Sequence, residues 1–219
     1  IIHAFKEYDA SEIIMGLHEK KTDGDKFWGI FTPDLVNQLN RQIILCRCNR
    51  PLNTLRRILV AVPSRVEFEQ GFYRWIERLA RLAENLSCRI IFHGRIESTS
   101  LINEYIRNQH PGVRAEYVLM EHWKEFTQLA QQMSSDHMLV VISARQGTVS
   151  YKPVFERLPL ELYRHYHEHN LMVVFPDQNG QSPEDMTFTA PQHHSVDSAY
   201  SSIVNWVMNK IDKGRSDAS

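Results

Sequence analysis

The chain has 219 residues and a formal net charge of −1, with 25 lysines and arginines against 26 aspartates and glutamates. This balance argues against a nucleic-acid partner, because a nucleic-acid surface needs a strong excess of basic residues. No run approaches the roughly 20 apolar residues that cross a bilayer, so we expect no direct membrane insertion of this stretch. Hydrophobic residues make up 42% of the sequence, which is enough for a core of one or two domains.

Strands and helices alternate along the sequence. Short apolar runs rich in β-branched residues predict buried strands, and apolar residues at i, i+3 and i+4 predict helices. In chain order we expect a helix end at 1–9, a strand at 11–15, a loop at 16–26, a helix at 32–40, a strand at 42–48 and a linker at 49–53. We then expect strands at 57–62, 89–93, 115–120, 139–142 and 171–175, with helices at 68–85, 100–108, 124–133 and 153–167 between them. This alternation predicts an α/β fold with a parallel sheet covered on both faces.

The first part of the chain is repeated in the second. Residues 9–16 align without gaps on residues 136–143, and the same offset of 127 places residues 43–45 on residues 170–172. There is room for three further strands before the second copy but not before the first. We therefore expect one partial and one complete copy of the same unit, cut from a longer chain.

The repeat predicts three regions along the chain. They are the C-terminal part of a first domain (1–50), a complete second domain (51–176), and a loop followed by an amphipathic helix (177–219). We expect the two copies to join through their final strands, 42–48 and 171–175, because an unpaired apolar edge strand is prone to aggregation.

Ligands of an open parallel sheet bind beyond the carboxyl ends of its strands. In the complete copy the loops at 63–65 and 143–147 form this crevice, which makes Ser64 and Ser143 candidate ligand-binding residues.

Three polar residues, Arg145, Ser150 and Lys152, come shortly before the helix expected to begin at Pro153. Together with the positive end of that helix they could hold an anion, so they are candidate ligand-binding residues too. The alternative is that Ser150 caps the helix while Arg145 and Lys152 are solvated.

The order of strands and helices, and Gly16 with Gly29 thirteen positions later, resemble the universal stress protein family. The resemblance implies a three-layer fold of the adenine nucleotide alpha hydrolase-like type. Many members bind ATP through a loop of the form Gly-x2-Gly-x9-Gly-(Ser/Thr), so Gly16 and Gly29 are candidate ligand-binding residues. In this chain Glu19 replaces the second glycine and Ile30 replaces the small hydroxyl residue. A carboxylate there would repel phosphate.

The complete copy departs further from the ATP-binding pattern of the family. Ser143, Gln146, Glu156 and Arg157 occupy the four motif positions, and Pro63 stands where the family has an aspartate near the adenine. We therefore expect neither ATP nor another cofactor.

The runs Pro51–Pro63 and Ser143–Tyr151 resemble the tandem universal-stress-protein-like domains attached to the cytoplasmic end of some bacterial sodium or potassium:proton antiporters. The resemblance implies a regulatory domain on the cytoplasmic side of the bacterial inner membrane. It also implies the membrane antiporter domain of the same polypeptide as partner, and a homodimer through the final strands.

Two rival interpretations stay open. One is a free-standing tandem universal stress protein that binds a nucleotide or a small anion. The other is an enzyme of the related adenine-nucleotide-hydrolysing type, which would need the missing phosphate loop. The sequence has no nucleophile elbow, zinc-protease motif or Walker loop, so we expect no catalytic residues and no enzyme.

The remaining chemistry-bearing residues have ordinary structural interpretations. Three cysteines without a framework indicate a reducing compartment, and Cys46 with Cys48 makes a poor zinc site, since zinc takes four ligands. His165 and His169 share a helix face that suits a metal, but the helix dipole also favours histidines there; we expect no metal. Some of the eleven histidines could sense pH, as a hypothesis. The charged residues of the helix at 68–85 are expected to form a solvated face with i, i+3 and i, i+4 pairs.

Overall fold

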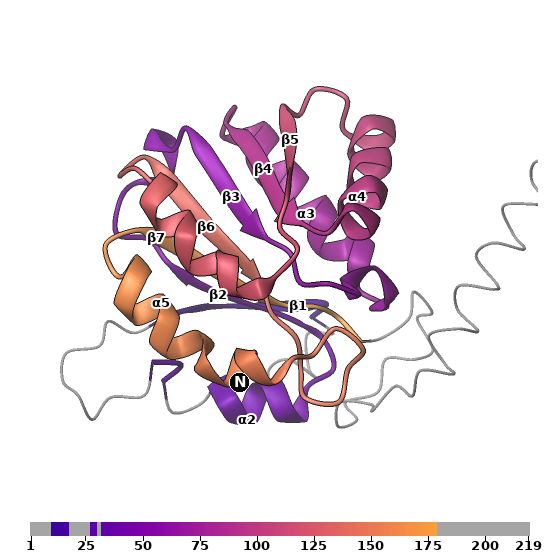
Figure 1. Cartoon of the computed structure of the whole chain (residues 1–219), viewed down its shortest axis with the longest axis vertical. Helices are drawn as coiled ribbons and strands as arrows, with labels where there is room; N and C mark the ends of the chain where they lie inside the picture. Colours follow the sequence, from indigo (N-terminus) through magenta and orange to yellow (C-terminus); the bar gives the residue numbers. More distant parts are fainter. Residues whose placement is uncertain (1–9, 18–26, 30–31, 179–219) are drawn as a thin grey trace, which may run out of the picture.

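The computed structural model describes residues 10–17, 27–29 and 32–178 (Figure 1). Its strands are β1 (Glu12–Gly16), β2 (Gln42–Arg47), β3 (Arg57–Ala61), β4 (Arg89–Gly94), β5 (Ala115–Leu119), β6 (His137–Ile142) and β7 (Asn170–Phe175). Its α-helices are α2 (Thr32–Gln38), α3 (Phe72–Asn85), α4 (Ile96–Gln109) and α5 (Leu158–Tyr166). Its 3-10 helices are η1 (Leu52–Thr54), η2 (Val66–Phe68), η3 (Trp123–Gln132) and η4 (Pro153–Arg157). Within these ranges no helix has both the length and the apolar character that a membrane span requires.

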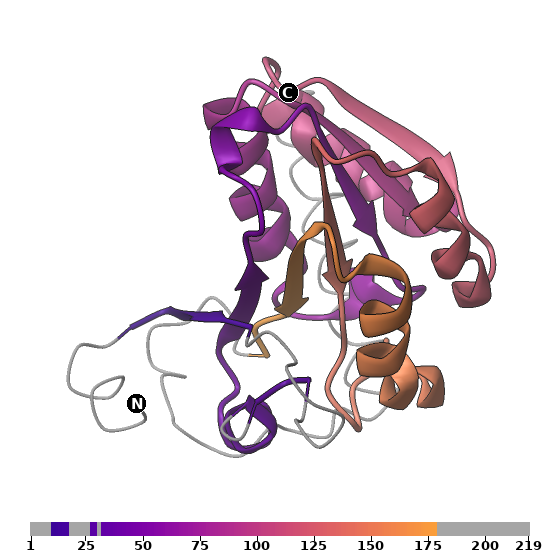
Figure 2. The ribbon, with the colours of Figure 1, turned by 90° about the vertical axis from the view of Figure 1, so that its left-hand side faces the viewer.

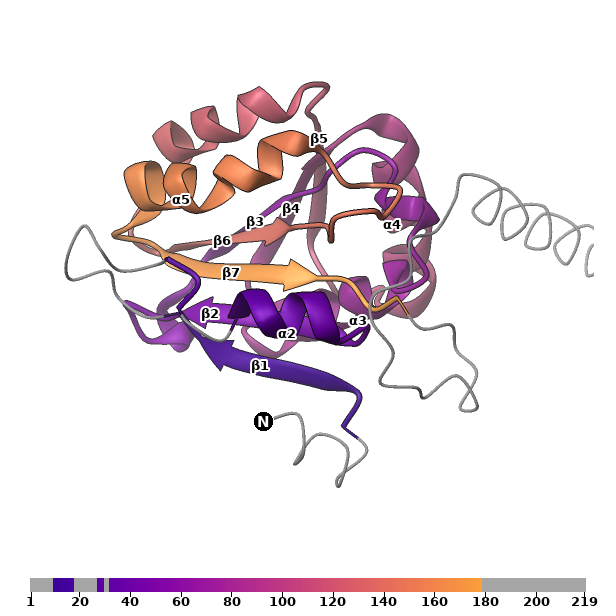
Figure 3. The same cartoon turned by 90° about the horizontal axis from the view of Figure 1, so that it is seen from below.

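The strands of the described part form one seven-stranded sheet in the order β1-β2-β7-β6-β3-β4-β5. Neighbouring strands run parallel except β2 and β7, which are antiparallel with Ile43 opposite Phe175 and Arg47 opposite Leu171 (Figure 3). The α/β fold is confirmed, and so is the expected pairing between the final strands of the two copies. Because of this one antiparallel pair, the sheet as a whole is mixed.

Helices cover the two faces of the sheet and form two separate cores (Figure 2). One core lies under α2, η3 and α5 and includes Leu35, Phe126 and Leu162. The other lies under α3 and α4 and includes Trp75 and Ile102. α2 of the partial copy and α5 of the complete copy lie on the same face of the sheet and pack on the same core.

Several helices differ from their expected bounds for local reasons. The helix expected from residue 68 begins at Phe72, because Glu69 is extended after the 3-10 turn η2. The segment expected as a helix at 124–133 is the 3-10 helix η3. The helix expected at 153–167 is split into η4 and α5, because Pro159 has no N–H to donate to the carbonyl four residues earlier. The elements expected at 1–9, and at 179–219, lie outside the described residues.

The structure corrects the phase of the repeat. Ile13 and Ile43 face the same core as Leu139 and Leu171, but the offset of 127 places Ile13 on Val140, which faces the other core. A slip of one residue moves a strand side chain to the other face, so this alignment is wrong in the strands. In addition, Ile13 pairs with Ile43, 30 residues later, whereas Leu139 pairs with Leu171, 32 residues later. No single offset therefore aligns both strands.

Candidate functional site

The loops after β3 and β6 lie at the carboxyl edge of the complete copy. Ser143 follows β6 and is buried, and its backbone N–H donates to the carbonyl of Val174 over 2.8 Å. Ser64 is half-buried, and the next residue, Arg65, is exposed with a left-handed backbone at φ 68°. Both predicted serines thus lie at the expected edge of the sheet.

Arg145 is buried at the same edge, with 3% of its surface exposed. Its guanidinium donates to the carbonyls of Val36 over 3.1 Å, of Arg41 over 2.6 Å, and of Pro176. Its cation also lies 6.0 Å from the centroid of the Phe175 ring. Val36 and Arg41 belong to the partial copy, so Arg145 ties the two copies together. The structure corrects the expectation that Arg145 is either solvated or available to an anion.

Arg145 keeps its charge in this buried position. Burial lowers the pKa of Arg145 to about 10, and the negative charges of Asp177 and Glu69 act against that shift. The side chain is therefore protonated at neutral pH and holds its carbonyl partners as a cation.

Ser150 is bound by a buried carboxylate. The hydroxyl and the backbone N–H of Ser150 both donate to Oε1 of Glu69, over 2.6 and 3.0 Å. Ser150 is 1% exposed and Glu69 is 6% exposed. The residue before η4 is Lys152, and no side chain caps that helix, so the expected cap by Ser150 is wrong. A carboxylate facing Ser150 also disfavours an anion there.

Carboxylates of the protein itself lie at the N-termini of two helices on this edge. The main chain of Asp177 lies against the first turn of α3, 2.5 Å from where a Cβ on Gly71 would be, and its carboxylate pairs with Arg74. Glu67 accepts a hydrogen bond of 2.5 Å from Ser98 in the first turn of α4. Helix N-termini attract anions, so these two side chains take positions that favour phosphate in other proteins.

Three cations gather at the same edge. Arg65 follows β3, Arg95 stands between β4 and α4, and Lys152 precedes η4. Burial lowers the pKa of the Lys152 ammonium, and the charges of Arg95 and Arg65 lower it further. In the described part of the chain, no carboxylate lies within 4.0 Å of these three groups. This cluster is the part of the edge that suits a small anion best.

Gly16 and the complete copy's loops lie at opposite edges of the sheet. β1 is parallel to β2, which is antiparallel to β7, so the carboxyl end of β1 and Ser143 point in opposite directions. Gly16 is exposed, and a Cβ added there would meet no atom within 4 Å. Gly29 has a φ of 75°, which favours glycine. Residues 18–26 between them, which include Glu19, and the following Ile30 lie outside the described residues.

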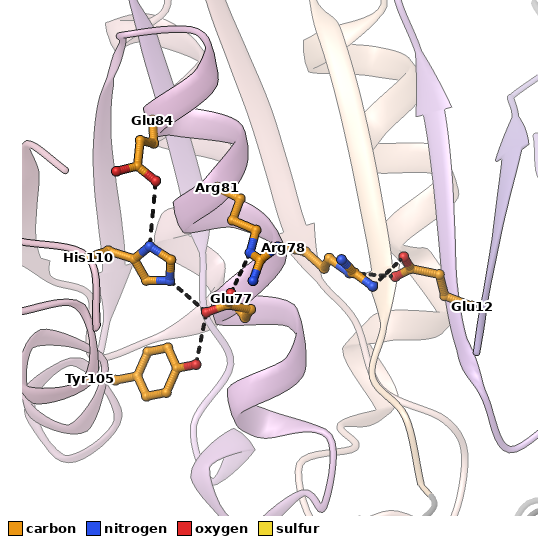
Figure 4. A network of polar contacts seen from close by, with 7 residues as sticks. All are labelled: Glu12, Glu77, Arg78, Arg81, Glu84, Tyr105 and His110. Atoms are coloured by element: carbon orange, nitrogen blue, oxygen red, sulfur yellow. Dashed lines mark hydrogen bonds and ion pairs between the residues drawn. The ribbon is translucent and has the colours of Figure 1, made fainter. Parts of the chain in front are cut away.

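A polar network that the sequence did not predict joins α3 to the end of α4 (Figure 4). The Glu77 carboxylate accepts a hydrogen bond of 2.9 Å from Tyr105, lies 2.6 Å from Nε2 of His110, and pairs with Arg81. Nδ1 of His110 lies 3.7 Å from Glu84. The hydrogen bond with His110, followed by those from Arg81 and Tyr105, lowers the pKa of Glu77 to about 2, although burial opposes the shift.

Helical spacing predicts only one pair of this network. Arg81 and Glu77 form the expected i, i+4 pair, but Glu77 also holds His110, 33 residues later. Periodicity within one helix carries no information about such a distant partner.

Cysteines and histidines form no metal centre in the part of the chain that the structure describes, where no group of three or more His, Cys, Asp or Glu side chains is arranged to hold a metal ion. Cys88 is buried, Cys46 is half-buried and Cys48 is exposed. Burial, with a smaller contribution from Cys48, raises the pKa of the Cys46 thiol to about 11, so it is protonated at neutral pH. Nε2 of His165 lies 3.4 Å from Glu161, one turn earlier.

No protein-family model matches the chain, and no curated protein matches its sequence. Solved structures similar to it include one reported as a universal stress protein from Pseudomonas aeruginosa UCBPP-PA14 and a protein of unknown function from Pseudomonas aeruginosa PAO1. Each is 15% identical over 80% of this chain, with a TM-score of 0.46, and about two thirds of those chains are covered, 67% and 66%. A universal stress protein in complex with cAMP is 11% identical, with a TM-score of 0.35, over 57% of this chain and 98% of that chain. The α/β assignment of this chain rests on the strand order and pairing given above.

Proposed function

We propose that this chain is a regulatory and interaction domain, not an enzyme, of a membrane cation:proton antiporter on the cytoplasmic side of the bacterial inner membrane. The proposal that the domain is not an enzyme rests on one observation: groups of the protein itself occupy the predicted anion site. Arg145 binds three backbone carbonyls there, and Ser150 binds Glu69. With its crevice filled in this way, the domain would act through contacts at its surface.

The antiporter part is supported by the resemblance of Pro51–Pro63 and Ser143–Tyr151 to domains of such transporters. The proposed partner is the membrane domain of the same polypeptide. A homodimer through the final strands stays a prediction. Because β2 and β7 both lie inside the sheet, two chains would have to exchange the β2–β7 pairing to form it.

The outer edge of β1 is the contact surface that this proposal favours. Among the described residues no strand pairs with β1 on its outer side. Ile14 on β1 is 65% exposed and borders an apolar groove of about 170 Å³, which is also lined by Ile44, Trp75 and Leu79. An exposed apolar edge strand readily pairs with another segment, and we assign that segment to the antiporter polypeptide.

Antiport by the complete polypeptide in everted membrane vesicles tests the proposal. Ile14→Lys places a charge at the groove and should shift the pH dependence of antiport. Ile96→Lys is the matched control, because Ile96 is 67% exposed at the start of α4. The proposal fails if the complete polypeptide has no membrane-spanning segments, or if both variants behave like the parent.

A second candidate function is a free-standing universal stress protein that binds a small anion. The mutually repelling cations Arg65, Arg95 and Lys152 at the carboxyl edge favour it. Calorimetric titration with ATP separates the two functions. Micromolar binding that is lost in Lys152→Gln supports the second and counts against the first, whereas absence of binding supports the first.

A further inference from the structure

A basic pocket lies at the amino edge of the complete copy, opposite the crevice described above. It is formed by η1, by the chain just beyond α3, and by the first residues of β3 and β4. The pocket has a volume of about 660 Å³ and is lined by Asn53, Thr54, Leu55, Arg56, Arg57, Leu86, Ser87, Arg89 and Arg114. Four of these nine residues are arginines and none is acidic, in a chain with a net charge of −1.

Two of the four arginines are held in place by partners. Nη2 of Arg114 donates to the carbonyl of Ser87 over 2.6 Å, where the main chain turns beyond α3 with a φ of 51°. Nη1 of Arg89 lies 2.8 Å from Oε1 of Glu116, which is outside the pocket lining. The hydrogen bond to the carbonyl of Ser87 favours anion binding, because it offsets the partial negative charge of a carbonyl near the negative end of α3.

The other two arginines carry charge that is little compensated. Arg56 and Arg57 are exposed, and in the described ranges no carboxylate lies within 4.0 Å of either guanidinium. Asp136 is close enough to respond to Arg56: the hydrogen bond from Ser134 lowers the pKa of Asp136 most, and Arg56 contributes less. Burial lowers the pKa of His137 most; the charge of Asp136 raises this pKa, and the charge of Arg57 lowers it by a smaller amount. Positive charge therefore dominates the pocket.

We propose that this pocket binds an anion that carries two or more phosphate groups. Guanidinium groups bind phosphate oxygens through paired hydrogen bonds, and several of them around one concave site can hold more than one phosphate. The volume is in the range of small-molecule sites. The phosphates can belong to a soluble diphosphate or to a lipid headgroup. This inference stands apart from the proposed function, whose crevice lies at the other edge of the sheet.

Calorimetric titration of the full chain with inorganic pyrophosphate tests the pocket. The double variant Arg56→Gln with Arg57→Gln should weaken binding by about tenfold or more, because charge-assisted hydrogen bonds to phosphate are lost. The matched control is Lys124→Gln with Arg164→Gln, which removes the same charge from exposed positions on η3 and α5, outside the pocket lining. Binding to this control should stay within about twofold of the parent.

A variant that is expected to strengthen binding distinguishes a loss of the site from misfolding, because misfolding cannot increase affinity. Glu116→Gln releases Arg89 from its ion pair and should tighten pyrophosphate binding by about twofold. Absence of pyrophosphate binding at millimolar concentration overturns the proposal. Equal weakening in the two double variants also overturns it, because that would be general charge attraction.

Vesicle co-sedimentation distinguishes the two sources of phosphate. Phosphatidylcholine vesicles with cardiolipin, whose headgroup has two phosphates, are compared with phosphatidylcholine alone. Binding to the cardiolipin vesicles that is lost with Arg56→Gln and Arg57→Gln supports the pocket as a headgroup site. Pyrophosphate binding without vesicle binding supports it as a site for a soluble diphosphate.

Discussion

Arg78 on α3 forms a two-point ion pair with Glu12 on β1, and so connects the two copies beside their shared sheet (Figure 4). Nη2 of Arg78 lies 3.0 Å from Oε1 of Glu12, and Nε lies 3.2 Å from Oε2. Oε2 also accepts a hydrogen bond of 3.0 Å from Gln42 at the start of β2. The outermost strand of the partial copy is thus tied to a helix of the complete copy.

We expect Arg78→Ala to loosen β1 without unfolding the protein. The pair is partly exposed, with 42% of the Arg78 side chain accessible, so its loss should cost at most about 1 kcal/mol. Amide hydrogen exchange should become faster in β1 and stay unchanged in β3. The control is Arg89→Ala, which breaks the similarly exposed pair with Glu116 inside the complete copy. Unchanged exchange in β1 of Arg78→Ala would show that the ion pair does not hold this strand.

Arg145→Met should be strongly destabilising. It leaves three backbone carbonyls of both copies without their donor, and we expect the free energy of unfolding to fall by about 3–5 kcal/mol in urea denaturation. Arg145→Lys should recover only part of this loss, because a single ammonium lacks the planar fork that reaches several acceptors.

The control for Arg145 is Arg95→Met, which removes an exposed arginine from the same edge and should change stability by no more than about 0.5 kcal/mol. If Arg145→Met loses no more than this control, the clamp between the copies is not important for stability.

Much of the fold could be predicted from the sequence, because runs such as Ile58–Ala61 and Leu139–Ile142 are apolar and buried on both sides of a parallel sheet. The pairing of the final strands could also be predicted, because an apolar strand left unpaired at a sheet edge is prone to aggregation. The residue-by-residue alignment of the two copies could not be predicted from the sequence. In continuously apolar strands such as Ile43–Leu45, every residue is hydrophobic, so a slip of one residue leaves no trace in the sequence.

The candidate site could be predicted less well. The sequence showed that the phosphate-binding glycines are absent, but it did not show which side chains occupy the crevice. Arg145 bonds to Val36 and Arg41 across 109 and 104 residues, and Ser150 meets Glu69 across 81 residues. Such contacts depend on the antiparallel β2–β7 pair and on the chain after β7, and local spacing does not reveal them.

Ser150→Ala should destabilise the protein by about 1–2 kcal/mol, because the buried Glu69 carboxylate loses its hydroxyl donor and keeps only the backbone N–H of residue 150. Chemical denaturation at neutral pH measures this loss. Ser100→Ala, at an exposed position of α4, is the control and should have little effect. A loss as small as that of the control would mean that the carboxylate finds another donor.

The Glu77 network should make stability depend on pH in the acid range. The pKa of Glu77 is lowered in the folded protein from 4.5 to about 2, first by its hydrogen bond with His110. A carboxyl group with a lowered folded pKa stabilises the protein fully above its unfolded pKa, and this contribution disappears as the pH falls from 4.5 toward 2. Burial and the contact with Glu77 raise the pKa of Tyr105 to about 12, so Tyr105 remains a donor throughout this range.

Urea denaturation at a series of pH values checks this dependence. Glu77→Gln should be less stable than the parent at neutral pH, and its stability should change less between pH 4.5 and about 2, because the titrating group with the lowered pKa is gone. Glu97→Gln, at an exposed position in the first turn of α4, should keep the slope of the parent. If Glu77→Gln keeps that slope as well, the acid sensitivity arises from other carboxylates, and the contact between Glu77 and His110 at 2.6 Å does not couple folding to pH.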